Sequence, residues 1–188
     1  MASTGNSLLA NVNASQLVLV DLQTRLLKVM SNRSKLLRNC EILIKAANIL
    51  SVPILATEQY PKGLGTTDPA LSDIWPDNMQ PVAKTCFSCC GSDNFKKTLT
   101  DINKDQVILA GIEAHVCVLQ TALDLLKDGK QVFVVADAVD SRSADNKQLA
   151  LDRLRQSGAI VIPTESVLFE WLQDATHENF KSVTALIR

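Results

Sequence analysis

The chain has 188 residues, of which 46% are hydrophobic, and a formal net charge of −1. These values exclude a disordered chain and predict a single domain over residues 1–188. They argue against nucleic-acid and membrane partners, because the charge is near neutral and no apolar run approaches the roughly 18 residues of a membrane span. The five cysteines follow no disulfide spacing, so we expect reduced thiols in an intracellular, most simply cytoplasmic, compartment.

Apolar runs typical of strands alternate with amphipathic stretches along the first half of the chain. A strand is predicted over residues 16–21, where it ends in a carboxylate, and a helix over residues 36–50. A second strand over residues 52–56 precedes a loop from 57 to 78. That loop is long for a plain connection, and long loops are often functional. A third short strand is predicted over Val82–Lys84.

The second half continues this alternation. Strands are predicted over residues 102–110, 131–136 and 159–163, and helices over residues 116–127, 144–156, 166–172 and 177–187. Continuous apolar strands with interleaved helices predict an α/β fold. We expect a single-domain open parallel β-sheet with helices on both faces, a Rossmann-like three-layer α/β/α arrangement.

Three residues with reactive side chains follow or close predicted strands: Asp21, Lys84 and Cys117. The carboxyl ends of parallel strands share one edge, where open α/β folds place their sites. A carboxylate there could take the proton of a thiol, and a lysine could keep that carboxylate ionised. The nearby start of a helix should favour the thiolate of Cys117. Backbone amides near Glu113 and Cys117 could stabilise an oxyanion.

The same residues allow other interpretations. Cys117 alone could be a small core residue, Asp21 could cap a helix, and Lys84 could be a solvated strand end. Cys86 and Cys89 have a C-x-x-C spacing, so a thiol-redox protein is one alternative. A zinc site would need more ligands, and the sequence has no second cysteine pair or histidine near this one. A binding or scaffold protein with a little-used site is another.

Taken together, several segments resemble the isochorismatase-like cysteine hydrolases, and the resemblance extends over a core of about residues 17–172. The matching segments are LVDLQ (19–23), Lys84 with Phe87-Ser88, GIEAHVCV (111–118), VADA (135–138) and SRS (141–143). Within that family, TEQYPKGLG (57–65) is most similar to the eukaryotic isochorismatase domain-containing proteins.

The resemblance implies roles by position. Asp21 would be the general base, Lys84 its electrostatic partner and Cys117 the nucleophile. A non-proline cis peptide bond between Ile112 and Glu113 would aim the amides of Glu113 and Cys117 at an oxyanion. The implied reaction is hydrolysis of a small amide or related acyl substrate through a thioester. The bond that is hydrolysed would be a C–N bond.

The candidate substrate-binding residues are Gln23, Glu58, Phe87 and His115. Nicotinamidases hold a metal just after the second strand, but this chain has Glu58, Gln59, Tyr60 and Pro61 there, and its two histidines lie far along the chain. We therefore expect no metal and no cofactor. The expected partners are a small-molecule substrate and further copies of the chain, since the resemblance implies a homo-oligomer. Trp75, Phe169 and Trp171 are candidate interface aromatics.

Overall fold

A computed structural model describes residues 8–77 and 79–188. Residues 1–7 of the predicted domain, and Asn78 at the end of the predicted loop, lie outside the described residues. In the described part, six strands form one parallel sheet in the order β3-β2-β1-β4-β5-β6. The strands are β1 (Ser15–Val20), β2 (Ile54–Gln59), β3 (Val82–Lys84), β4 (Gln106–Ile112), β5 (Gln131–Asp140) and β6 (Ile160–Ile162). The predicted open parallel sheet is confirmed.

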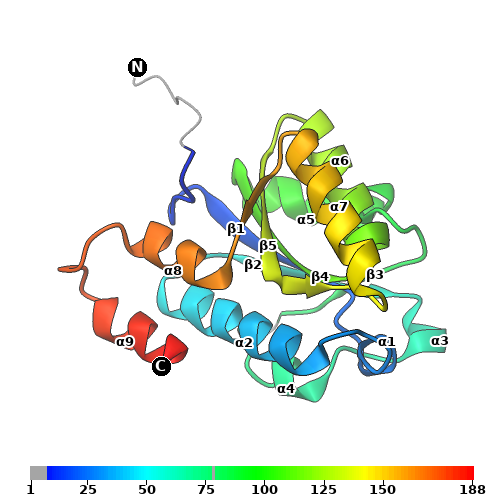
Figure 1. The fold of residues 1–188 in the computed structure, drawn as a ribbon, viewed down its shortest axis with the longest axis horizontal. Coiled ribbons are helices and arrows are strands. Elements are labelled where there is room, and N and C mark those ends of the chain that lie inside the picture. The colour runs from blue at the N-terminus through cyan, green and yellow to red at the C-terminus, as the bar shows by residue number, and fades with distance from the viewer. Residues whose placement is uncertain (1–7, 78) are drawn as a thin grey trace.

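Helices cover both faces of this sheet (Figure 1). One face carries α2 (Arg33–Ile49), α8 (Thr164–Leu172) and α9 (Phe180–Thr184). The other carries α5 (Asp93–Ile102), α6 (Leu119–Lys127) and α7 (Ala144–Gln156). The shorter elements are α1 (Thr24–Leu27), α3 (Pro61–Leu64), α4 (Pro69–Ser72), η1 (Cys89–Gly91), η2 (Ala114–Val118) and η3 (Ala185–Ile187). None of the described helices combines the length and apolar character needed to cross a bilayer.

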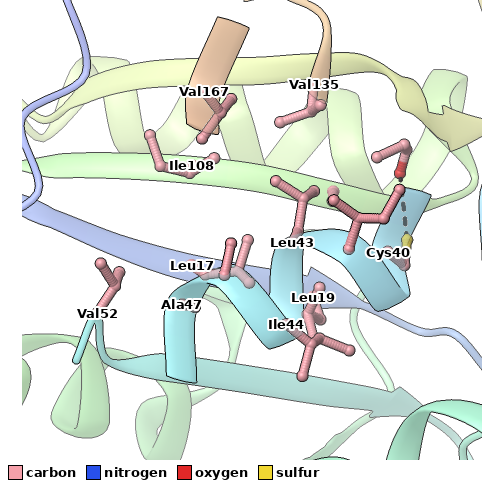
Figure 2. Packing of buried hydrophobic residues seen from close by; sticks show 14 of the residues in the cluster. Leu17, Leu19, Cys40, Leu43, Ile44, Ala47, Val52, Ile108, Val135 and Val167 are labelled. Carbon is pink, nitrogen blue, oxygen red and sulfur yellow. Dashed lines mark hydrogen bonds between the residues drawn. The ribbon is translucent and has the colours of Figure 1, made fainter. Parts of the chain in front are cut away.

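The core lies in two layers because successive strand residues point to opposite faces. In β1, Leu17 and Leu19 belong to the layer under α2, while Val18 and Val20 belong to the layer under α6. Figure 2 shows side chains of α2 packed over β1 and β4 in the first layer. Each such fully buried aliphatic side chain contributes about 1.5–3 kcal/mol relative to exposure. A parallel sheet buried on both faces explains the apolar runs of the sequence.

Helix α5 was absent from the sequence prediction, which began a strand at Ile102. The helix starts where the Ser92 hydroxyl accepts a hydrogen bond from the amide of Phe95, and it ends at Asn103, whose φ is 53°. Phe95 and Leu99 are buried with the four-residue spacing of one helix face. The serine cap and this spacing were visible in the sequence, and the strand itself begins only at Gln106.

The predicted loop over residues 57–78 is largely structured. Strand β2 continues to Gln59, and two short helices follow, each with a proline at its first position, Pro61 and Pro69. Proline suits that position because its missing N–H would have no partner within the helix. The Asp68 carboxylate accepts a hydrogen bond from the amide of Ala70 and so caps α4.

Candidate functional site

The site begins where β1 and β4 approach each other. Gly111 of β4 is in register with Val20, and its φ is 119°. A Cβ atom at Gly111 would lie 2.2 Å from the carbonyl oxygen of Val20, so only glycine allows this approach. Asp21, the residue that directly follows β1, has a φ of 53°. This left-handed conformation breaks the strand alternation and turns the Asp21 side chain toward the face that carries α6.

Asp21 and Lys84 form a buried ion pair. Nζ of Lys84 lies 2.7 Å from Oδ2 of Asp21, and the two side chains are 0% and 1% exposed. The ammonium also donates to Oε1 of Gln59 at 2.6 Å and to the carbonyls of Cys86 and Phe87 at 3.2 and 3.3 Å. Burial lowers the pKa of Lys84, but the Asp21 carboxylate and neighbouring thiols raise it more, so the net pKa is above its usual value. Lys84 is therefore a cation with every hydrogen engaged.

Cys117 lies in η2 directly before α6, and it is 7% exposed. Its thiol lies close enough to the Asp21 carboxylate for that carboxylate to change its pKa. Burial and the negative charge of Asp21 raise the pKa of Cys117 to about 12, although Lys84 acts in the opposite direction. Burial and Asp21 therefore favour the thiol form of Cys117 at rest, an effect opposite to the one expected from the start of a helix. The resting group is a thiol beside a carboxylate that can serve as a base.

The peptide bond between Ile112 and Glu113 is cis, as the resemblance implied. The Glu113 carboxylate accepts three hydrogen bonds from Arg142: Nη2 at 2.6 Å, Nε at 3.0 Å and the backbone amide at 3.2 Å. Burial raises the pKa of Glu113, but the bonds and charge of Arg142 bring it below its usual value. The Glu113 side chain is thus tied to the residues that follow β5, while the oxyanion role of its amide stays a prediction.

Gln23 and Glu58 lie near the site but are engaged with the protein itself. The Gln23 side chain is buried and donates to the carbonyls of Gln59 and Gly65 at 3.0 and 2.6 Å, while its Oε1 accepts from the amide of Gln59 at 2.7 Å. It has no hydrogen left for a substrate. Oε1 of Glu58 accepts from the amide and hydroxyl of Thr67 at 2.7 and 2.9 Å. Both residues anchor the segment after β2, and their contact with a substrate stays a prediction.

Phe87 and His115, the other two candidates, remain more accessible. The Phe87 residue is 56% exposed, and its carbonyl accepts the bond from Lys84 described above. His115 is half-buried, with Nδ1 3.0 Å from the hydroxyl of Ser141. Their contact with a substrate stays a prediction.

A cavity of about 420 Å³ flanks the lysine side of the site. Its lining includes Tyr60, Lys84 and Cys86, and Tyr60 is 53% exposed. The Tyr60 amide donates to the carbonyl of Lys84 at 2.7 Å, which joins the end of β2 to the end of β3. This cavity brings open space next to the buried cation.

The sequence analysis missed two side chains of the site, Thr57 and Gln59. The Thr57 hydroxyl donates to Oδ1 of Asp21 at 2.7 Å, and Gln59 accepts from Lys84. Both point to the same face because they are two residues apart in β2, whereas Glu58 points to the opposite face. Ending the predicted strand at residue 56 concealed this alternation. Extending it to Gln59 would have identified the pair.

Two further expectations can be compared with the structure. Trp171 is 1% exposed and donates its indole hydrogen to the hydroxyl of Ser15 at 3.1 Å, so it is a core residue and not an interface aromatic. Phe169 is 43% exposed. Within residues 8–77 and 79–188, no group of three or more His, Cys, Asp or Glu side chains is arranged to hold a metal ion.

Comparison with known proteins adds a family to this geometry. The sequence pattern of the isochorismatase domain matches residues 15–166. Isochorismatase domain-containing protein 2 of Danio rerio is 41% identical over 178 residues, which are 94% of this chain and 88% of that protein. The Homo sapiens protein of the same name is 39% identical over 176 residues, which are 93% of this chain and 83% of that protein.

Solved structures show the same fold. The MAR1 ribonuclease of Caenorhabditis elegans has a TM-score of 0.90 and 41% identity, covering 95% of this chain and 91% of that one. The YcaC gene product of Escherichia coli, described as an octameric hydrolase of unknown specificity, has a TM-score of 0.91 and 26% identity. That comparison covers 98% of this chain and 91% of the YcaC chain.

Proposed function

Because this chain belongs to the isochorismatase family, we propose that it is a cysteine-dependent hydrolase of a small amide or related acyl substrate. The observation that carries the proposal is the position of Asp21. Its carboxylate pairs with Lys84 at 2.7 Å and is close enough to the Cys117 thiol to raise its pKa. A base beside a buried nucleophile, and a fixed cation paired with that base, are the parts that nucleophilic acyl transfer needs.

In the proposed reaction, the Cys117 proton passes to Asp21 as the sulfur attacks the carbonyl carbon. The carbonyl electrons move to oxygen, where the amides of Glu113 and Cys117 stabilise the charge. When the intermediate collapses, the C–N bond breaks, the amine takes the proton from Asp21, and a thioester remains. Asp21 then takes a proton from water, whose oxygen attacks the thioester. The acid leaves, and the proton returns to the sulfur.

The raised pKa of Cys117 fits this order of events. A thiol with a pKa of about 12 is protonated at neutral pH. It becomes a nucleophile only as its proton moves to Asp21, so deprotonation and attack occur together. Lys84 stabilises the carboxylate before the transfer and the forming thiolate during it.

Trapping the acyl-enzyme tests the proposal. A panel of small amides and activated esters is incubated with the wild type, Cys117→Ser and the matched control Cys86→Ser, whose thiol is partly exposed. We expect an acyl adduct at Cys117 by mass spectrometry in the wild type and Cys86→Ser, and none in Cys117→Ser. A reversible disulfide between Cys86 and Cys89, without any adduct, would favour the thiol-redox alternative, although Cys89 is fully buried.

A second candidate function is RNA cleavage, because the C. elegans relative is named a ribonuclease. Binding to RNA phosphates relies on lysine and arginine, and this chain has a formal net charge of −1. We therefore expect no cleavage of labelled RNA under conditions in which the acyl adduct forms. Cleavage that is lost in Cys117→Ser would instead assign RNA as a substrate of the same site.

A further inference from the structure

Thr57 contacts Asp21 through both its main chain and its side chain. It lies in β2 in register with Val20 and is 1% exposed. Its carbonyl accepts from the Asp21 amide at 3.2 Å, and its hydroxyl lies 2.7 Å from Oδ1 of Asp21. Lys84 occupies the other carboxylate oxygen, Oδ2. The two oxygens of Asp21 therefore have two different, buried donors.

The direction of the hydrogen bonds follows from the chemistry of the groups. An ionised carboxylate only accepts, so the single hydrogen of the Thr57 hydroxyl points to Asp21. The same hydroxyl lies 3.7 Å from Sγ of Cys89, and in that contact the thiol must be the donor. Burial raises the pKa of Cys89 to about 11, which keeps this thiol protonated at neutral pH. A chain of donors runs from Cys89 through Thr57 to Asp21.

We propose that Thr57 is a positioning residue, whose hydroxyl, oriented by the Cys89 thiol, fixes the Asp21 carboxylate in the orientation that accepts the Cys117 proton. A carboxylate can rotate about its Cβ–Cγ bond, and contacts at both oxygens prevent that rotation. A base that is held in the productive orientation catalyses proton transfer much better than one that can rotate. This inference rests on the proposed function, in which Asp21 is the base for Cys117.

The test compares Thr57→Val, which keeps the branched shape without the hydroxyl, with Thr57→Ser, which keeps the hydroxyl. The probe is p-nitrophenyl acetate, and the measurement is the rate of acylation of Cys117 from about pH 5 to about pH 9 in steps of roughly one pH unit. We expect Thr57→Val to acylate at least about tenfold more slowly and Thr57→Ser within about threefold of the wild type. The acid limb of the Thr57→Val profile should move to higher pH, because the carboxylate loses a donor that stabilises its charge.

Each outcome supports or overturns the inference. Equal rates and profiles in the wild type and Thr57→Val would overturn it, as would equal losses in Thr57→Ser and Thr57→Val. If Thr57→Val does not fold, Cys89→Ala decides: removing the orienting thiol should slow acylation by about twofold to threefold, and no change overturns the inference. A wild type that is never acylated at Cys117 would overturn the proposed function itself, which separates the two failures.

Discussion

Nζ of Lys84 lies 2.7 Å from Oδ2 of Asp21, and both side chains are buried. The same carboxylate accepts a hydrogen bond from the hydroxyl of Thr57 and raises the pKa of the Cys117 thiol. One buried carboxylate therefore acts on a cation, a thiol and a hydroxyl. Two opposing effects follow, because Asp21 favours the protonated form of Cys117 at rest and, in the proposed reaction, is also the base that removes its proton.

Replacing Asp21 should separate these two effects. Asp21→Asn removes the charge that raises the pKa of Cys117 and leaves Lys84, which lowers it. The pKa of Cys117 should fall, so a larger fraction is thiolate at pH 8 and iodoacetamide should label Cys117 faster than in the wild type. Turnover of any acyl substrate should nevertheless fall by at least about 100-fold, because the base is gone.

The measurement is the pH dependence of labelling, followed by peptide mass spectrometry at Cys117. Asp105→Asn is the matched control, since the Asp105 side chain is 89% exposed and should change neither quantity. Slower labelling in Asp21→Asn would show that the carboxylate promotes the thiolate at rest, which contradicts this account.

Lys84→Met should destabilise the fold. The methionine keeps most of the packing but leaves the Asp21 carboxylate buried without its cation, and removing one partner of a buried pair typically costs about 3–5 kcal/mol. Urea unfolding should show this loss in the free energy of unfolding. The double variant Asp21→Asn/Lys84→Met should recover part of it, because no unpaired charge remains.

The exposed pair Lys45–Glu41 provides the control for this prediction. Its side chains are 41% and 42% exposed, so Lys45→Met should change the free energy of unfolding by only about 0–1 kcal/mol. If Lys84→Met were no more costly than Lys45→Met, the buried pair would contribute little to stability.

Gly111→Ala should be far more costly than Gly129→Ala. Both glycines have positive φ, 119° and 80°, but a Cβ at Gly111 would lie 2.2 Å from the Val20 carbonyl oxygen, whereas nothing lies within 4 Å of one at Gly129. The left-handed conformation alone costs about 1–2 kcal/mol, which is the loss expected for Gly129→Ala. In Gly111→Ala the clash with Val20 should add a further loss of stability, because it pushes β1 away from β4 and moves Asp21. Urea unfolding of the two variants checks this, and equal losses would refute the steric explanation.

Self-association is the last prediction. The family resemblance of the sequence implies a homo-oligomer, and we expect this chain to form one. Light scattering at micromolar concentration should give a mass that is a multiple of 20.5 kDa. A mass equal to one chain would contradict the prediction.

The sequence by itself determined the sheet and the location of the site. Apolar runs are local patterns, and strands buried on both faces must be apolar throughout, so the order of strands and helices was largely visible. Polar residues that end such runs, Asp21 and Lys84, mark one edge because parallel strands share their direction. Helix α5 was missed although its cap and spacing were present, since Ile102 was assigned to the following strand.

Only the tertiary structure decided what each side chain of the site contacts. Gln23 and Glu58 form hydrogen bonds with the segment after β2. Thr57 donates a hydrogen bond to Asp21, and Gln59 accepts one from Lys84. The raised pKa of Cys117 also arises there, because its causes are burial and a neighbouring carboxylate from another strand end. These properties depend on strand register and on distances between residues far apart in sequence. The sequence contains the residue types and the periodicity of the apolar positions. Hydrogen-bond partners and the desolvation of side chains arise only when the helices and strands pack.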